Sequence, residues 1–177
     1  MRYRIIEESI NIPENVNIEI KENKIIVSGP KGKVERRIEH PRIYITIENN
    51  ILILKAYFAT RREAKHLYTL ASHIKNAING VLHGFQYKLK AVYVHFPFKM
   101  KIQNNKFIIE NFLGERKNRE LEIPEGVNVK IEGDIVIVEG VDIEIVGNFA
   151  GRLEALTKIK EKDLRKFQDG LYIIEKP

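Results

Sequence analysis

The hydrophobic positions of this chain fall into short runs of Ile, Val and Leu that meet at pairs of turn-forming residues. Asn, Asp and Gly tolerate the positive φ angles that tight hairpin turns require. The pattern therefore predicts four β-hairpins, with further strands over residues 33–38 and 119–123. The four predicted turns are Glu22-Asn23, Asn49-Asn50, Asn104-Asn105 and Gly133-Asp134.

The hairpins form an internal repeat. Residues 18–27 align with residues 100–109 at an offset of 82, and residues 45–54 align with residues 129–138 at an offset of 84. Two blocks in the same order at nearly the same offset predict a duplicated domain of about 80 residues. A local match of residues 12–17 with residues 123–128 breaks this order. We interpret it as one proline-led strand entry that is used twice.

Each half is predicted to end in a helix. Thr60 and Glu63 have the spacing of a capping box, and apolar residues follow them at spacings of three and four. Gly80 is expected to end this helix. In the second half, we expect Asn148 to cap a shorter helix with an apolar stripe over residues 149–156.

These elements predict an α+β fold with two duplicated domains, each an antiparallel β-sheet of hairpins packed on one α-helix. We expect the N-terminal repeat to span residues 1–83 and the C-terminal repeat to span residues 84–177. A sheet with one helix needs about 80 residues to close a modest core, which matches the length of each half.

Composition narrows the classes of function. The chain has no cysteine, which excludes disulfides, thiolate zinc sites and cysteine nucleophiles and favours a reducing cytoplasm. Its longest apolar runs are a few residues, whereas a membrane-spanning helix needs about 20. The first residues carry acids in place of the apolar region of a signal peptide. We therefore expect a globular protein without a membrane partner.

Residues that could carry catalysis or bind a metal do not form a recognisable site. The glycine-and-lysine turn at residues 29–33 lacks the spacing and the Ser/Thr of a P-loop. His66 and His73 lie seven residues apart on the predicted helix, about 10.5 Å, which is too far for one metal ion. We expect no enzymatic activity, no cofactor and no metal. Two pairs of acids on predicted strands are interpreted as solvated surface residues: Asp142 with Glu144, and Glu120 with Glu122.

The charge distribution favours a polyanionic partner. The chain has 30 basic and 24 acidic residues, a net charge of +6. Residues 152–166 contain six bases against three acids, at a spacing that suits an irregular segment. Such bases can contact successive phosphates of a nucleic acid. They are Arg152, Lys158, Lys160, Lys162, Arg165 and Lys166.

The basic segment is followed by a predicted anchor. Phe167 and Tyr172 flank Asp169-Gly170, which we interpret as a turn that fixes the segment onto its domain.

Four segments carry a family resemblance. Residues 165–173, RKFQDGLYI, resemble the C-terminal signature of archaeal and eukaryotic members of the ribosomal protein L6 family, known as L9 in eukaryotes. Residues 146–154 resemble the start of the family's last helix, residues 27–32 its first-domain turn and residues 12–14 its opening strand. The resemblance covers essentially the whole chain in order. Asn148-Phe149 departs from it, since relatives more often carry Gln and a small residue there.

The resemblance implies a non-enzymatic structural protein of the large ribosomal subunit in the cytoplasm. Members of the family bind large-subunit ribosomal RNA, mainly through the second domain, near the stalk base and the sarcin–ricin loop. The implied partners are this RNA, neighbouring large-subunit proteins and translational GTPases. With the charge pattern, it assigns RNA contacts to the six bases above and to Phe167, and a structural turn to Asp169 and Gly170.

One observation conflicts with this assignment, and one alternative remains. Residues 1–84 hold 14 bases against 9 acids, whereas residues 85–177 hold 16 against 15, so the net charge lies mainly on the first half. We follow the family and the local cluster, because a net charge includes bases far from any interface. The alternative is a free-standing protein-interaction module that offers its sheet edges to a partner strand. Salt-sensitive RNA binding that maps to the basic segment distinguishes the two.

Overall fold

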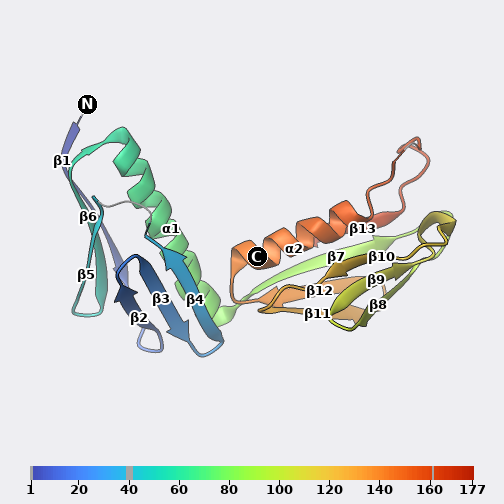
Figure 1. Ribbon diagram of the computed structural model, residues 1–177, viewed down its shortest axis with the longest axis horizontal. Coiled ribbons are helices and arrows are strands. Elements are labelled where there is room, and N and C mark those ends of the chain that lie inside the picture. The colour runs from blue at the N-terminus through green and yellow to red at the C-terminus, as the bar shows by residue number, and fades with distance from the viewer. Residues whose placement is uncertain (1, 39–41, 161) are drawn as a thin grey trace. The chain divides into compact units, whose positions relative to one another are not determined.

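A computed structural model describes residues 2–38, 42–160 and 162–177, and the chain forms two compact units, Met1–Gly84 and Phe85–Pro177 (Figure 1). The elements of unit 1 are β1 (Arg2–Asn11), β2 (Asn17–Lys21), β3 (Lys24–Gly29), β4 (Gly32–Arg37), β5 (Tyr44–Glu48), β6 (Ile51–Thr60) and α1 (Arg61–His83). Those of unit 2 are β7 (Phe85–Val92), β8 (Lys99–Gln103), β9 (Lys106–Glu110), a 3-10 turn (Phe112–Gly114), β10 (Arg119–Glu122), β11 (Val127–Glu132), β12 (Ile135–Gly140), α2 (Ile143–Leu156) and β13 (Gly170–Glu175).

Both units are built from antiparallel sheets. Unit 1 has a sheet of order β1-β6-β5 and a sheet of order β2-β3-β4. Unit 2 has a sheet of order β11-β12-β7-β13 and a sheet of order β10-β9-β8. The predicted α+β class with two duplicated domains is confirmed. Unit 2 has a strand, β13, that pairs with β7 and has no counterpart among the described residues of unit 1.

The two units repeat the same turns in the same order. Asn23 lies in the β2-β3 turn and Asn105 in the β8-β9 turn, and both accept a backbone hydrogen bond from the end of their sheet's third strand. The donors are the amides of Ile38, at 2.7 Å, and Ile123, at 2.9 Å. The hairpin turn between β5 and β6 corresponds in the same way to the turn between β11 and β12. The repeat predicted from the two offsets is therefore structural.

The competing match between residues 12–17 and 123–128 has a local explanation. The carbonyl of Pro13 accepts from the amide of Val16 at 3.0 Å, and the carbonyl of Pro124 accepts from the amide of Val127 at 3.3 Å. These turns lead into β2 and β11, which hold different positions in the repeat. The same proline-led turn thus introduces two unrelated strands.

Each helix closes a core by packing against strands of both sheets in its unit. Helix α1 contacts β6, β3, β1 and β4, while α2 contacts β7, β13, β12 and β10. The largest fully buried side chains of unit 1 are Ile25, Leu52, Leu54, Leu67 and Ile74. Those of unit 2 are Phe107, Phe112, Phe149, Leu89, Ile109, Leu153 and Leu171.

The predicted start of α2 is wrong by six residues. The cap is Asp142, whose carboxylate accepts from the amide of Glu144 at 2.9 Å, and Asn148 is an exposed residue inside the helix. Asp142 and Glu144 are therefore not strand residues. Residues 143–146, Ile-Glu-Ile-Val, read as a strand because β-branched residues favour one. The helix forms because Val146, together with three later apolar residues, packs into the core.

The predicted end of α1 is also corrected. The capping box at Thr60 and Glu63 is present, but the helix continues through Gly80 to His83. Gly84 follows with φ of 73°, and its amide donates to the carbonyl of Gly80 at 2.8 Å. Gly80 is a buried helical residue, and the left-handed position that favours glycine is Gly84. No helix in the described residues is long and apolar enough to cross a membrane.

Candidate nucleic-acid interface

The predicted basic segment is a loop between α2 and β13, here called the basic loop (residues 157–169). It is irregular in its described residues, as predicted from the spacing of its bases. Lys158, Lys160 and Lys162 are exposed, while Ile159 between them is only 9% exposed. Because a buried side chain alternates with exposed ones, this part of the loop runs extended along the unit with its lysines outward.

Thr157 closes the base of the loop. Its side-chain hydroxyl donates to the carbonyl of Glu154 at 3.0 Å and accepts from the amide of Leu171 at 2.9 Å. Thr157 and Leu171 are both buried, at 3% and 1% exposure. One hydroxyl thus joins the last turn of α2 to the start of β13, which brings the two ends of the loop together.

Asp169 fixes the returning arm of the loop to the segment after β7. Its fully buried carboxylate accepts from the amide of Val94 at 2.8 Å and from the amide of His95 at 3.2 Å, and it contacts His95 Nδ1 at 3.1 Å. Burial raises the pKa of this carboxyl, but these three donors outweigh it and hold the pKa below its usual value. Asp169 is therefore a charged anchor at neutral pH.

Aromatic stacking supports the same attachment. The ring of Phe167 stacks on the ring of His95, with centroids 4.5 Å apart and planes at 20°. The ammonium of Lys162 lies 4.7 Å from the centroid of Phe167. Both ring contacts are made within the unit, so Phe167 supports the shape of the loop and orients Lys162.

The tip of the loop is a turn organised by Asp163. Its backbone carbonyl accepts from the amides of Lys166, at 3.0 Å, and Phe167, at 2.9 Å, and its carboxylate accepts from the amide of Arg165 at 3.0 Å. The side-chain and backbone hydrogen bonds from Arg165 lower the pKa of Asp163. The turn directs Arg165 and Lys166 into solvent.

A groove of about 530 Å³ lies between the basic loop, the end of α2 and residues 113–119. Three loop lysines at alternate positions line it, and Glu115, the acid among its described lining residues, is paired. The residues that line it are Leu113, Glu115, Arg119, Ala155, Leu156, Lys158, Ile159, Lys160 and Lys162.

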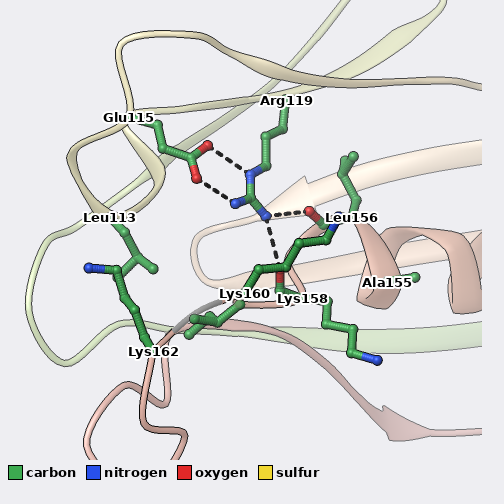
Figure 2. Close-up of a pocket in the computed structure, with 9 residues that line it drawn as sticks. Leu113, Glu115, Arg119, Ala155, Leu156, Lys158, Lys160 and Lys162 are labelled. Atoms are coloured by element: carbon green, nitrogen blue, oxygen red, sulfur yellow. Dashed lines mark hydrogen bonds and ion pairs between the residues drawn. The ribbon is translucent and has the colours of Figure 1, made fainter.

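Arg119 organises the wall of this groove. Figure 2 shows its guanidinium between Glu115 and the end of α2: Nε and Nη2 donate to the Glu115 carboxylate at 2.9 and 2.5 Å, and Nη1 donates to the carbonyl of Leu156 at 2.6 Å. The side-chain hydrogen bond from Arg119 is the main reason that the pKa of Glu115 is lowered. The guanidinium also lies over the ring of Phe112, 4.2 Å from its centroid. Arg119 thus caps α2 and neutralises Glu115, so that among the described lining residues the charge not balanced in this way is that of the three lysines.

The structure separates the predicted RNA-contact residues into groups. Lys158, Lys160 and Lys162 line the groove, Arg165 and Lys166 are exposed at the loop tip, and Arg152 is exposed on α2 and does not line the groove.

The predicted turn at Asp169 and Gly170 has a different local form. Gly170 is the first residue of β13, with φ of +159°, at the edge of the extended region, and the anchoring comes from the carboxylate of Asp169. A Cβ at Gly170 would lie 3.3 Å from the Thr157 hydroxyl. Close packing, more than a turn conformation, therefore favours glycine here.

Three structural residues of the site were missed from sequence. Arg119 was read only as the start of a strand, and Thr157 and His95 were not singled out. Glu115 and Arg119 have the four-residue spacing of an ion pair, which is a weak signal outside a helix. For Thr157 and His95 no sequence signal reports the contacts with Leu171 and Asp169, which lie 14 and 74 residues away. Among the described residues, no group of three or more His, Asp or Glu could hold a metal ion.

Comparison with known proteins decides the family. The model of ribosomal protein L6 matches residues 12–84 and residues 96–170, once in each unit, and the second match includes the whole basic loop. The chain belongs to the ribosomal protein L6 family. As a member of the L6 family, it is a structural, non-enzymatic protein of the large ribosomal subunit in the cytoplasm, and its partners are ribosomal RNA and other ribosomal proteins. A free-standing interaction module is therefore not favoured.

Archaeal L6 relatives are similar to this chain over almost its whole length. Large ribosomal subunit protein uL6 of Aeropyrum pernix is 45% identical, over 97% of this chain and 94% of the relative. The uL6 proteins of Staphylothermus marinus and Nanoarchaeum equitans are 47% and 45% identical, over 96% and 99% of this chain and 94% and 96% of their own lengths.

Proposed function

We propose that this chain binds large-subunit ribosomal RNA through unit 2, with the groove beside the basic loop as the main contact. The observation that carries the proposal is the way the loop is held. Buried hydrogen bonds at Thr157 and Asp169 fix both ends, and the lysines between them project outward at alternate positions. Cations at fixed spacing can neutralise successive phosphates with little loss of conformational freedom.

The remaining basic residues extend this surface. Arg165 and Lys166 at the loop tip, and Arg152 on α2, are exposed and supply further phosphate contacts. Phe167 acts as a positioning residue, because its ring is in contact with His95 and Lys162. Unit 1 has the larger net charge, but cations are paired internally in both units, including Lys24, Lys33 and Lys75 of unit 1 and Arg165 at the loop tip, so net charge alone does not locate the interface.

We further propose that the bound RNA lies near the stalk base and the sarcin–ricin loop, and that translational GTPases pass close to the protein. The support for this location is the resemblance of the C-terminal segment to the archaeal and eukaryotic L6 signature. The basic loop runs into that segment and shares residues 165–169 with it, so the RNA contact and the location are proposals about neighbouring parts of one surface.

Salt dependence of RNA binding tests the groove. Replacing Lys158, Lys160 and Lys162 by Ala is expected to lower the slope of log affinity against log salt by about 2 to 3, because each lost phosphate contact removes about 0.7–0.9. Affinity for a large-subunit RNA fragment is measured from about 50 to 200 mM salt, where multi-phosphate contacts weaken steeply.

A matched triple variant controls for net charge. Lys101, Lys106 and Lys130 of unit 2 are paired with glutamates at 2.5, 3.2 and 2.9 Å, and their side chains are 43%, 41% and 53% exposed. Replacing these three by Ala removes the same charge and is expected to leave the slope nearly unchanged. Equal slopes for the two triple variants would contradict a groove-centred interface.

Chemical footprinting of large subunits assembled with and without the protein tests the location. Protection of nucleotides at the stalk base and around the sarcin–ricin loop is expected. Protections confined to another region of the RNA would leave the groove in place but would overturn the proposed location.

A further inference from the structure

The segment that joins β7 to β8 exposes large apolar side chains beside the basic loop. Tyr93, Val94 and Phe96 are 44%, 62% and 53% exposed, and they lie within four consecutive residues. Clustered apolar exposure of this kind marks a binding surface more often than chance. We call residues 93–97 the aromatic segment.

The aromatic segment is held firmly against the basic loop. Asp169 accepts from the backbone amides of Val94 and His95, and the ring of His95 stacks on Phe167. The backbone on both sides of the contact is therefore fixed before any ligand binds. A side chain displayed from such a position loses little freedom on binding.

The rings of this region have different uses. Phe167 is in contact with His95 and Lys162, and Tyr93 packs edge-on against the buried Phe98, with centroids 6.1 Å apart. Phe96 follows His95 in the chain and is 53% exposed, so about half of its surface remains accessible to a flat ligand.

The charge around the segment identifies the ligand. Residues 93–101 contain no acid, and residues 162–168 of the neighbouring loop carry Lys162, Arg165 and Lys166 against one acid, Asp163, which is bound to Arg165. A ligand that is both flat and anionic fits this surface, and unpaired RNA has both properties. Bases inside a duplex are stacked on one another and cannot reach an aromatic side chain, whereas bases in loops and bulges can.

We propose that Phe96 stacks on an unpaired nucleobase of the bound RNA, so that the interface reads a loop or bulge in addition to phosphates. This inference rests on the proposed function and names the RNA feature that unit 2 recognises. The basic loop and the aromatic segment then act together: the lysines follow the backbone, and Phe96 selects a strand with an exposed base.

The test uses the full chain and two RNA hairpins with the same stem, one closed by a six-nucleotide loop of large-subunit sequence and one fully paired except for a minimal closing turn. Phe96→Ala is expected to weaken binding of the looped hairpin roughly 5- to 150-fold, the contribution of one stacked base. Binding of the paired hairpin and the salt slope for both are expected to stay unchanged, because no phosphate contact is removed. Tyr68→Ala, which truncates a 51% exposed aromatic of α1, is the matched control.

A fluorescent variant gives an independent reading. The chain contains no tryptophan, so Phe96→Trp introduces a single reporter at the site. Stacking predicts that the looped hairpin quenches this fluorescence and that the paired hairpin does not.

The other outcomes are distinct. Equal loss of both hairpins, or unchanged binding of the looped one, would overturn the stacking proposal. If the lysine triple variant nevertheless lowers the salt slope, the groove proposal stands without the stacking proposal. If Phe96→Ala leaves both RNAs unaffected but lowers incorporation of the chain into large subunits, the segment docks a protein and the stacking proposal is wrong.

Discussion

At the scale of single residues, Asp169 positions the proposed interface although it is not itself part of it. Its side chain is fully buried and holds three donors of the aromatic segment. A buried carboxylate is stable only when donors of this kind compensate for its desolvation. The position of the basic loop therefore depends on one charge that no ligand needs to touch.

Asp169→Asn is expected to loosen this attachment while leaving the fold of unit 2 intact. The amide group keeps one acceptor oxygen but places N–H donors where the carboxylate accepted hydrogen bonds. Hydrogen exchange of the Val94 and His95 amides should accelerate, and RNA affinity should fall although every lysine remains. Asp163→Asn at the exposed loop tip is the control, with unchanged exchange at both amides. Unaltered exchange in Asp169→Asn would show that the stacking of Phe167 on His95 is enough to hold the basic loop on the aromatic segment.

Glu63 makes a similar contribution in unit 1, where it can be tested through pH. Hydrogen bonds from Thr60, followed by the Arg42 guanidinium at 2.9 Å, lower its pKa to about 2. The pKa in the folded chain lies below the unfolded value of about 4.3. The Glu63 carboxylate therefore contributes its full stabilisation of the fold above pH 4.3, and this contribution is lost as the pH falls toward 2.

Glu63→Gln is therefore expected to unfold more easily than the unmutated chain at pH 6 and to differ little from it near pH 2. Urea unfolding midpoints measured between these values check this. Glu48→Gln, an exposed glutamate of β5 in the same unit, is the control. A constant difference between Glu63→Gln and the unmutated chain across this range would mean that the charge of Glu63 is not what stabilises α1.

At the scale of elements, the basic loop is joined to the sheet by β13. This strand pairs with β7 on the edge opposite β12, and unit 1 has no corresponding strand among its described residues. The segment that follows the second helix thus adds the proposed RNA-binding surface to the duplicated fold. Thr157 links the two elements that bound this addition.

Thr157→Val is expected to lower the free energy of unfolding by about 1–3 kcal/mol, the usual result of leaving a buried donor unsatisfied. Valine has nearly the same shape but cannot accept from the amide of Leu171. Urea unfolding measures the loss, and Thr157→Ser, which keeps the hydroxyl, should recover most of it. Equal stability of the Val and Ser variants would indicate that water replaces the hydroxyl.

Elements with strong local signals could be predicted from sequence, and those defined by distant contacts could not. The hairpin turns follow from Asn pairs such as Asn104-Asn105, which adopt positive φ, and α1 begins at its capping box. The start of α2 was misplaced because Ile143 and its β-branched neighbours favour strands locally, and core packing overrides that preference.

The residues of the candidate site fall into the same two groups, those with a local signal in the sequence and those defined by distant contacts. The lysines of the basic loop were predicted because charge and spacing are visible in sequence. The contact of Arg119 with the Leu156 carbonyl spans 37 residues, and that of Asp169 with Val94 spans 75. No periodicity or local motif reports such pairings, so the residues that hold the site could be found only in the folded chain.

At the scale of the whole molecule, the chain consists of two units with separate cores. We propose that each folds independently, with RNA binding confined to unit 2. Fragments 1–84 and 85–177 are expected to give dispersed amide NMR spectra that overlay on the full-length spectrum, apart from residues near Gly84. Only the second fragment should bind the large-subunit RNA with the slope of the full chain. Collapse of either spectrum, or equal RNA binding by both fragments, would contradict this division.

The order of the strands also bears on synthesis. Residues 169–171, which close the basic loop, follow every other strand and helix of both units along the chain, so they leave the translating ribosome after all of these elements. Until then, the lysines of the loop lie on an open segment without their anchors at Thr157 and Asp169. A nascent chain therefore cannot present the assembled phosphate-binding surface before its scaffold has emerged. If the groove binds RNA as proposed, this topology separates the synthesis of the lysines from the assembly of the surface that recognises RNA.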